Sequence, residues 1–202
     1  MKVEAKHISI VFNNAYVIKQ KNFCLENMQS VLLQGNNGTG KTTLIKALAG
    51  IKSLDAGEIN YFSKGVEIDK KTFQKKLGLC LGVQFLCLDM TLEENFKLYY
   101  EKFYQDAYVQ SLLDNFLLNH KLQQPLNTLS KGELQKAALC RALLFDPEVV
   151  FLDEPFDGLD QTAQKQLIQW IEGNKHKKSM LLCTHINGLP ESFFDQVWDL
   201  NQ

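Results

Sequence analysis

Apolar positions near the start of the chain alternate with polar ones, as they do in strands that have one buried face. Residues 3–12 predict a first strand, the turn residues Asn13-Asn14 follow it, and residues 16–25 predict a second strand. The continuous apolar run at 30–34 stops at Gly35, which is typical of a fully buried strand.

Strand and helix patterns alternate through the rest of the chain, with one long interruption. We predict a helix from Lys41 to Gly50, a strand at 148–153, a helix at 162–171 and a strand at 179–183. Strands that alternate with helices indicate a parallel sheet covered by helices.

The interruption is helical and opens with a start signal. Residues 91–94 read T-L-E-E, the form of a capping box, and apolar side chains then recur at helical intervals toward Leu144. This stretch looks inserted into the sheet. We therefore expect one domain of 202 residues, with a sheet-containing core at 1–76 and 145–202 and a helical part at about 77–144.

Composition narrows the choice of partners. The net charge is -1, from 22 basic and 23 acidic residues, so the chain has no general attraction to nucleic acid or to an anionic membrane. No stretch approaches the roughly 18 uninterrupted apolar residues that a spanning helix needs. We expect no nucleic-acid partner, and a transport role would require a second, membrane-spanning chain.

The cysteines predict neither a disulfide framework nor a zinc site, because they are odd in number and no pair has C-x-x-C spacing. We expect reduced thiols that pack as small buried apolar side chains. The five are Cys24, Cys80, Cys87, Cys140 and Cys183.

The segment after the third predicted strand matches G-x-x-x-x-G-K-[ST], a loop that cradles phosphates between a strand and a helix. Its glycines let successive N–H groups turn inward, and the next helix presents its positive end to the same phosphates. Lys41 would reach the β- and γ-phosphates, and Thr42 would place its hydroxyl on Mg²⁺. A chance glycine-rich turn is the alternative. The predicted nucleotide-binding residues are Gly35, Asn36, Asn37, Gly38, Thr39, Gly40, Lys41, Thr42 and Thr43.

Two carboxylates, Asp153 and Glu154, end a later apolar strand at the sheet edge where the phosphate loop is also expected. Asp153 can hold Mg²⁺, and Glu154 is placed to polarise an attacking water. Before Pro155 the pair could be an ordinary turn. Its combination with the phosphate loop favours nucleotide hydrolysis.

The segment L-S-K-G-E at 129–133 resembles the LSGGQ signature of ABC ATPases, and 139–143 resembles the L-A-R-A-L helix that follows it in that family. The resemblance extends over essentially the whole chain. The same segment is an S-x-x-E capping box, and both interpretations can hold, because a helix N-terminus with a free serine hydroxyl suits a γ-phosphate. The predicted signature residues are Ser130, Lys131, Gly132 and Glu133.

This resemblance implies an α/β fold: a P-loop NTPase core with a mostly parallel sheet, an N-terminal antiparallel β part and an inserted α-helical part. It implies ATP and Mg²⁺ as cofactors. It also implies a second copy of the chain, or a related ATPase domain, as partner. Each ATP would then lie between the phosphate loop of one chain and the signature of the other.

The resemblance assigns roles to further residues. Phe12 lies about where the family has an aromatic side chain that stacks on adenine, although it could be an ordinary core aromatic. Asp157, Gly158 and Asp160 resemble the loop that crosses to the other subunit. His185 resembles the switch histidine that contacts the γ-phosphate, although a lone histidine is more often structural.

The chain departs from the family pattern in the signature and before the helical part. Lys131 replaces a signature glycine and could face the γ-phosphate or solvent, and Glu133 replaces glutamine. The segment at 77–84 should supply a glutamine to Mg²⁺. An ungapped count places Gly82 there, whereas Gln84 requires a two-residue shortening. We assign Gln84 as the metal ligand and keep Gly82 as the alternative.

The expected function is that of an ATP-hydrolysing subunit of a membrane transporter. A separate permease would dock near residues 82–100 and hold the chain at the cytoplasmic face of the membrane, and ATP-driven closure would move it as a rigid body. The pieces at 90–96 and 152–156 resemble the ATPases of bacterial haem exporters in cytochrome c maturation. The alternatives are an ABC-2 type exporter of other cargo, a non-transport ABC ATPase, and a generic P-loop kinase or GTPase.

Overall fold

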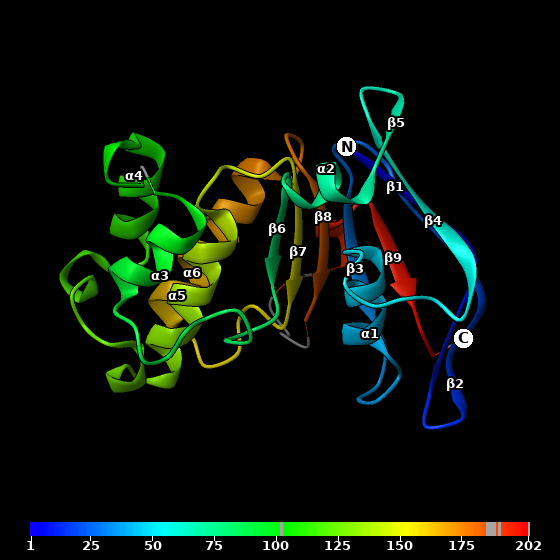
Figure 1. Cartoon of the computed structure of the whole chain (residues 1–202), viewed down its shortest axis with the longest axis horizontal. Helices are drawn as coiled ribbons and strands as arrows, with labels where there is room; N and C mark the ends of the chain where they lie inside the picture. The colour runs from blue at the N-terminus through cyan, green and yellow to red at the C-terminus, as the bar shows by residue number, and fades with distance from the viewer. Residues whose placement is uncertain (102, 185–188, 190, 202) are drawn as a thin grey trace.

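A five-stranded parallel sheet forms the centre of the molecule in the computed structural model (Figure 1). The structure describes all residues except 102, 185–188, 190 and 202. The strand order is β6-β7-β8-β3-β9, and each neighbouring pair runs parallel. These strands are β3 (Ser30–Gln34), β6 (Leu77–Cys80), β7 (Val149–Asp153), β8 (Ser179–Cys183) and β9 (Gln196–Asp199).

The central strands are mostly apolar because both faces of the sheet are covered. In β7, Val150 and Leu152 pack into a cluster with α3, α4, α5 and α6, whereas Val149 and Phe151 pack into a second cluster with α1 and the antiparallel strands. Alternate side chains of one strand thus belong to different cores, which explains the continuous apolar run. The helices are α1 (Lys41–Leu48), α2 (Lys70–Gln74), α3 (Leu92–Tyr99), α4 (Ala107–Asn115), α5 (Lys131–Leu143) and α6 (Gln161–Asn174).

A four-stranded antiparallel sheet lies at one end of the molecule, and α3 and α4 lie at the other (Figure 1). Its first hairpin turns through Asn13 and Asn14, which both have positive φ, at 49° and 61°. Two such residues make the type I′ turn that matches strand twist, and asparagine tolerates it well. The strands are β1 (Lys2–Phe12), β2 (Ala15–Leu25), β4 (Ala56–Ser63) and β5 (Val66–Ile68).

The predicted helix starts are confirmed. Thr91 caps α3 and Ser130 caps α5, and each forms a complete capping box with a glutamate three residues later. Helices α1 and α6 also begin where the pattern placed them. Short 3₁₀ segments connect the longer elements, at Phe103–Gln105, Asn119–Lys121, Leu126–Thr128 and Glu191–Phe193.

Several elements were not predicted, namely β4, β5, β6, β9 and α2. They are short or half-exposed, so their apolar periodicity is weak. Strand β6 pairs with β7 inside the parallel sheet. We therefore propose that the boundary between core and helical part, expected at about 77, lies after this strand.

The cysteines are free, as expected, but they are not uniformly buried. Cys80, Cys140 and Cys183 are buried, Cys24 is partly buried and Cys87 is exposed. The expectation of five buried thiols was therefore wrong at Cys87, which lies on the surface loop between β6 and α3. None of the helices that the structure describes has the length and apolar character needed to cross a bilayer.

Candidate functional site

The predicted phosphate loop connects β3 to α1. Gly40 immediately precedes the helix with φ of 98°, a left-handed conformation that favours glycine. A Cβ atom at this position would lie 2.2 Å from Cγ1 of Val17 on β2. The antiparallel sheet is therefore packed directly against the loop, and a side chain at Gly40 would push the two apart.

The loop is folded around the ammonium of Lys41. Lys41 Nζ donates hydrogen bonds to the carbonyl oxygens of Gly35 (2.7 Å) and Asn36 (3.1 Å), and the side chain of Thr39 donates to the same Asn36 oxygen. From the far end of the chain, Asn201 Oδ1 accepts the N–H of Asn36 at 2.9 Å. The lysine is 9% exposed, so its charge sits inside the loop that would hold phosphates.

The first turn of α1 meets the end of β7. Thr42 Oγ1 donates a hydrogen bond to Asp153 Oδ2 at 2.5 Å, across 111 positions of sequence. A hydroxyl and a carboxylate oxygen side by side fit the ligand preference of Mg²⁺, which takes one or two protein oxygens and completes its shell with phosphates and water. The structure therefore brings together two of the predicted metal ligands.

Glu154 is held in an uncommon backbone conformation. Its φ is 45°, in the left-handed region that a glutamate rarely adopts. Its N–H donates to the carbonyl of Cys183 on β8 at 2.9 Å, and the Cys183 thiol donates to its Oε1 at 3.6 Å. Burial, reinforced by the charges of Asp153 and Glu154, raises the pKa of Cys183, so the thiol stays protonated as a donor. Strained backbone of this kind is typical of functional positions.

These groups surround one pocket of about 330 Å³. Phe12 lies at its mouth with 61% of its surface exposed, which excludes the alternative of an ordinary core aromatic. The volume is in the range of small-molecule sites. The lining residues are Phe12, Val17, Asn37, Gly38, Gly40, Lys41, Thr42, Thr43, Asp153 and Glu154.

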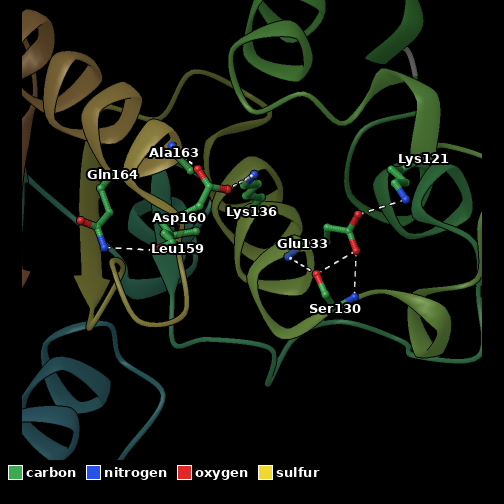
Figure 2. Close-up of polar contacts among 8 residues, drawn as sticks. All are labelled: Lys121, Ser130, Glu133, Lys136, Leu159, Asp160, Ala163 and Gln164. Atoms are coloured by element: carbon green, nitrogen blue, oxygen red, sulfur yellow. Dashed lines mark hydrogen bonds and ion pairs between the residues drawn. The ribbon is translucent and has the colours of Figure 1, made fainter.

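The signature forms the start of α5 (Figure 2). The Ser130 hydroxyl donates to Glu133 Oε2 at 2.8 Å and accepts the Glu133 N–H at 3.3 Å. The other carboxylate oxygen of Glu133 pairs with Lys121 Nζ at 3.0 Å. The expectation of a free serine hydroxyl was therefore wrong for the single chain, because the capping box already uses it.

The signature is joined to the loop at 157–160. Lys131 Nζ pairs with Asp157 at 2.9 Å, although both side chains are largely exposed. A Cβ on Gly132 would lie 2.7 Å from the carbonyl oxygen of Gly158, so a side chain there would separate the two segments.

Asp160 extends this connection to the next helix (Figure 2). It caps α6 through the N–H of Ala163 and pairs with Lys136 of α5 at 2.8 Å. The Lys136 ammonium holds the pKa of Asp160 below its ordinary value, with the Ala163 N–H adding to the effect. The predicted signature and crossing-loop residues are thus brought together.

The predicted metal ligand Gln84 and its alternative Gly82 do not line the described pocket, and neither do Gly35, Asn36 and Thr39 of the phosphate loop. Gln84 is exposed in the loop after β6 and is absent from the described lining. Gly82 has φ of 58° and lies beside Gln135, whose Oε1 would be 3.9 Å from an added Cβ. The choice between Gln84 and Gly82 stays a prediction. His185 lies outside the described residues.

Sequence reasoning missed two buried polar side chains on α5. Gln135 donates to the carbonyls of Glu154 (3.3 Å) and Pro155 (3.0 Å), which ties the signature helix to the acidic strand end. Arg141 hydrogen-bonds the carbonyl of Leu79 and lies 5.1 Å from the ring centroids of both Phe85 and Tyr99. Both residues could have been noticed in the sequence, because each is a polar residue on the apolar face of a helix with a clear capping box.

Comparisons with known proteins show which family the chain resembles. A sequence profile described as "ABC transporter" matches residues 18–157. The putative hemin import ATP-binding protein HrtA of Staphylococcus haemolyticus is 29% identical, over 99% of this chain and 97% of its own length. A zinc import ATP-binding protein ZnuC of Buchnera aphidicola is 32% identical, over 98% of this chain and 80% of its own length.

Solved structures share the fold. The structure of an ATP binding subunit of an ABC transporter superposes with a TM-score of 0.85 at 27% identity, covering 98% of this chain and 85% of that one. The ATP-binding cassette MJ0796, described as a dimer bound to ADP and Pi, superposes with a TM-score of 0.82 at 20% identity, covering 98% and 93%. At that identity the second likeness concerns the fold alone.

Proposed function

The chain belongs to the ABC transporter family as an ATP-binding and ATP-hydrolysing subunit, and on that premise we propose how its residues divide the work. Lys41 and the inward N–H groups of the loop hold the β- and γ-phosphates of ATP. Phe12, exposed at the mouth of the pocket, stacks on the adenine ring. The packing of Val17 against Gly40 holds the strands that carry Phe12 in place beside the phosphate loop.

Hydrolysis takes place at the floor of the same pocket. Thr42 and Asp153 would hold Mg²⁺, which would neutralise charge on the phosphate oxygens. Glu154 orients the attacking water and accepts its proton. Cys183 supports that role because its carbonyl and its thiol hold the backbone and the carboxylate of Glu154.

One observation carries the proposal. Thr42 and Asp153, far apart in sequence, meet at hydrogen-bonding distance in a pocket that also contains Lys41 and Glu154. A phosphate-binding cation, two oxygen metal ligands and a carboxylate base are the groups that phosphoryl transfer to water requires. A chance glycine-rich turn would not bring Asp153 and Glu154 into the same pocket as Lys41 and Thr42.

A second copy completes the site. The described lining of the pocket includes no signature residue, and the signature instead forms an exposed surface with the loop at 157–160. We propose that two chains pair head to tail, so that Ser130 of each faces the γ-phosphate held by the other. Pairing of two copies is supported by the solved cassette MJ0796, whose structure is described as dimeric.

The membrane partner docks beside the helical part, near residues 82–100. An apolar hollow of about 180 Å³ borders this segment at Phe85 and lies between the end of α1, strand β6 and helix α5, with Arg141 in its wall. Exposed apolar side chains continue along the loop and α3, at Val83, Leu88 and Leu98. Such a surface suits the cytoplasmic helices of a permease, which would hold the chain at the membrane.

The cargo is set by that permease rather than by this chain. Relatives named for hemin import and zinc import match the sequence about equally, at 29% and 32% identity. Export of haem for cytochrome c maturation, which the sequence resemblance favoured, gains no support from these relatives. Our proposal is therefore confined to ATP-driven transport through a separate permease.

The Glu154→Gln variant tests the proposal. It should bind ATP with unchanged affinity, lose activity by about 10²- to 10⁴-fold because the water lacks its base, and accumulate as an ATP-bound dimer in sedimentation velocity. Lys76→Ala, which removes a surface pair with Glu148 at the other end of the sheet, is the matched control and should behave as the unaltered chain. Hydrolysis at the unaltered rate by Glu154→Gln would remove this residue from the mechanism.

A further inference from the structure

The hydroxyl of Ser130 is shared with a negative charge. Glu133 Oε2 accepts both the Ser130 hydroxyl and the Ser130 N–H, each at 2.8 Å. A carboxylate is an acceptor only, so the hydroxyl proton must point toward it. An anion that approaches the Ser130 hydroxyl therefore also approaches the Glu133 carboxylate, which is hydrogen-bonded to that hydroxyl (Figure 2).

Glu133 is ionised under ordinary conditions. The N–H of Ser130, the ammonium of Lys121 and the Ser130 hydroxyl, in that order of effect, lower its pKa to about 2. Repulsion between like charges grows as their distance falls and as water is excluded. An uncompensated carboxylate at this place would thus oppose a phosphate at Ser130.

Lys121 supplies the compensating charge. Its Nζ lies 3.0 Å from Glu133 Oε1, the oxygen that faces away from Ser130. The two side chains are 22% and 28% exposed, so solvent screens them less than it screens the Lys131–Asp157 pair at 74% and 64%. Backbone hydrogen bonds to Leu118 and from Gln124 fix the turn that carries the lysine.

We propose that Lys121 is a positioning residue for the signature: it neutralises Glu133, so that this glutamate can hold Ser130 at the start of α5 and release its hydroxyl to the γ-phosphate of the opposite chain without repelling that phosphate. The inference rests on the proposed role of Ser130 across the dimer. The chain has glutamate where the signature that it resembles has a neutral glutamine. Lys121 and Glu133 then act together as the neutral equivalent of that glutamine.

The experiment is a double-mutant cycle on the purified chain. Lys121→Ala should raise the ATP concentration for half-maximal dimerisation and the KM for ATP by about tenfold, since one close charge is left unbalanced. ATP binding to the monomer should not change. Adding Glu133→Gln to the same chain should restore both values to within about twofold of the unaltered protein, because a neutral amide needs no counter-charge. Lys121→Arg, which keeps the charge, should behave as the unaltered chain.

Rescue separates this role from a merely structural one. If Lys121 only stabilised the fold, Glu133→Gln would not restore the KM, and that result would overturn the proposal. The same conclusion would follow if Lys121→Ala matched the surface control Lys76→Ala.

Ser130→Arg distinguishes these failures from failure of the proposed function. Its bulk and charge should abolish ATP-driven dimerisation while the monomer still binds ATP. If Ser130→Arg is inactive and Lys121→Ala is normal, only the role of Lys121 falls. If Ser130→Arg is fully active, the signature does not act across the dimer, and both inferences fall together.

Discussion

The phosphate-loop face and the signature face lie on one chain but differ in how much of their geometry that chain completes. On the first, Lys41, Thr42, Asp153 and Glu154 converge in one pocket whose polar groups already point at each other. On the second, the Ser130 hydroxyl is occupied by its own helix.

The two faces differ in what positions their side chains. The phosphate-loop groups stand at the ends of buried strands and at the start of a packed helix, so folding alone positions them. The signature groups stand at an exposed helix start, and their hydrogen bonds must be exchanged when a partner arrives. Both faces satisfy their polar groups within the single chain, but only the phosphate-loop face gathers its groups in one pocket without a second chain.

The largest effect that would test this comparison is expected from Lys41→Ala. Because the ammonium is buried in the loop and is proposed to contact two phosphates, its removal should weaken ATP binding to the monomer by about 10- to 100-fold. Isothermal titration on the isolated chain measures this. The paired variant Lys131→Ala, on the signature face, should leave monomer affinity unchanged, and equal losses in both would abolish the distinction between the faces.

Phe12→Ala should have a smaller effect of the same kind. Loss of a stacking platform costs about 1–2 kcal/mol, so ATP affinity should fall by about 5- to 30-fold. Phe12→Trp should keep or improve it. Phe12 is exposed at the mouth of the pocket, so the folded state should be little disturbed, which the melting temperature would show. If Phe12→Ala and the unaltered chain bound ATP equally, the adenine would have to lie elsewhere.

The same contrast explains what could be predicted from the sequence. Apolar runs and the phosphate-loop spacing predicted β3, α1, β7 and β8, because buried strands and tight glycine loops impose strong local rules. The capping boxes predicted the starts of α3 and α5 for the same reason.

Contacts between distant side chains leave no such local trace. The pairing of Lys121 with Glu133 and the buried amide of Gln135 depend on how the helical part folds back onto α5. Strands β4, β5 and β9 gain their regularity from neighbours rather than from their own periodicity. Lys131 illustrates the point, since its ion pair with Asp157 is a placement that the sequence, which left phosphate and solvent open, did not indicate.

The smallest expected effect concerns that ion pair. Exposed pairs contribute about 0–1 kcal/mol, so Lys131→Ala should change the ATP concentration for half-maximal dimerisation by less than about threefold. Asp157→Ala breaks the same pair from the other side.

If the pair only links the signature to the crossing loop, the two variants should shift dimerisation in the same direction. If Lys131 instead leaves Asp157 to bind the γ-phosphate, Lys131→Ala should weaken the dimer by more than tenfold and Asp157→Ala should strengthen it, because the freed lysine no longer has a competing partner. Opposite effects of the two variants on dimerisation would show that Lys131 binds the γ-phosphate in the dimer. The signature face would then contribute a phosphate-binding charge, as Lys41 is proposed to do on the phosphate-loop face.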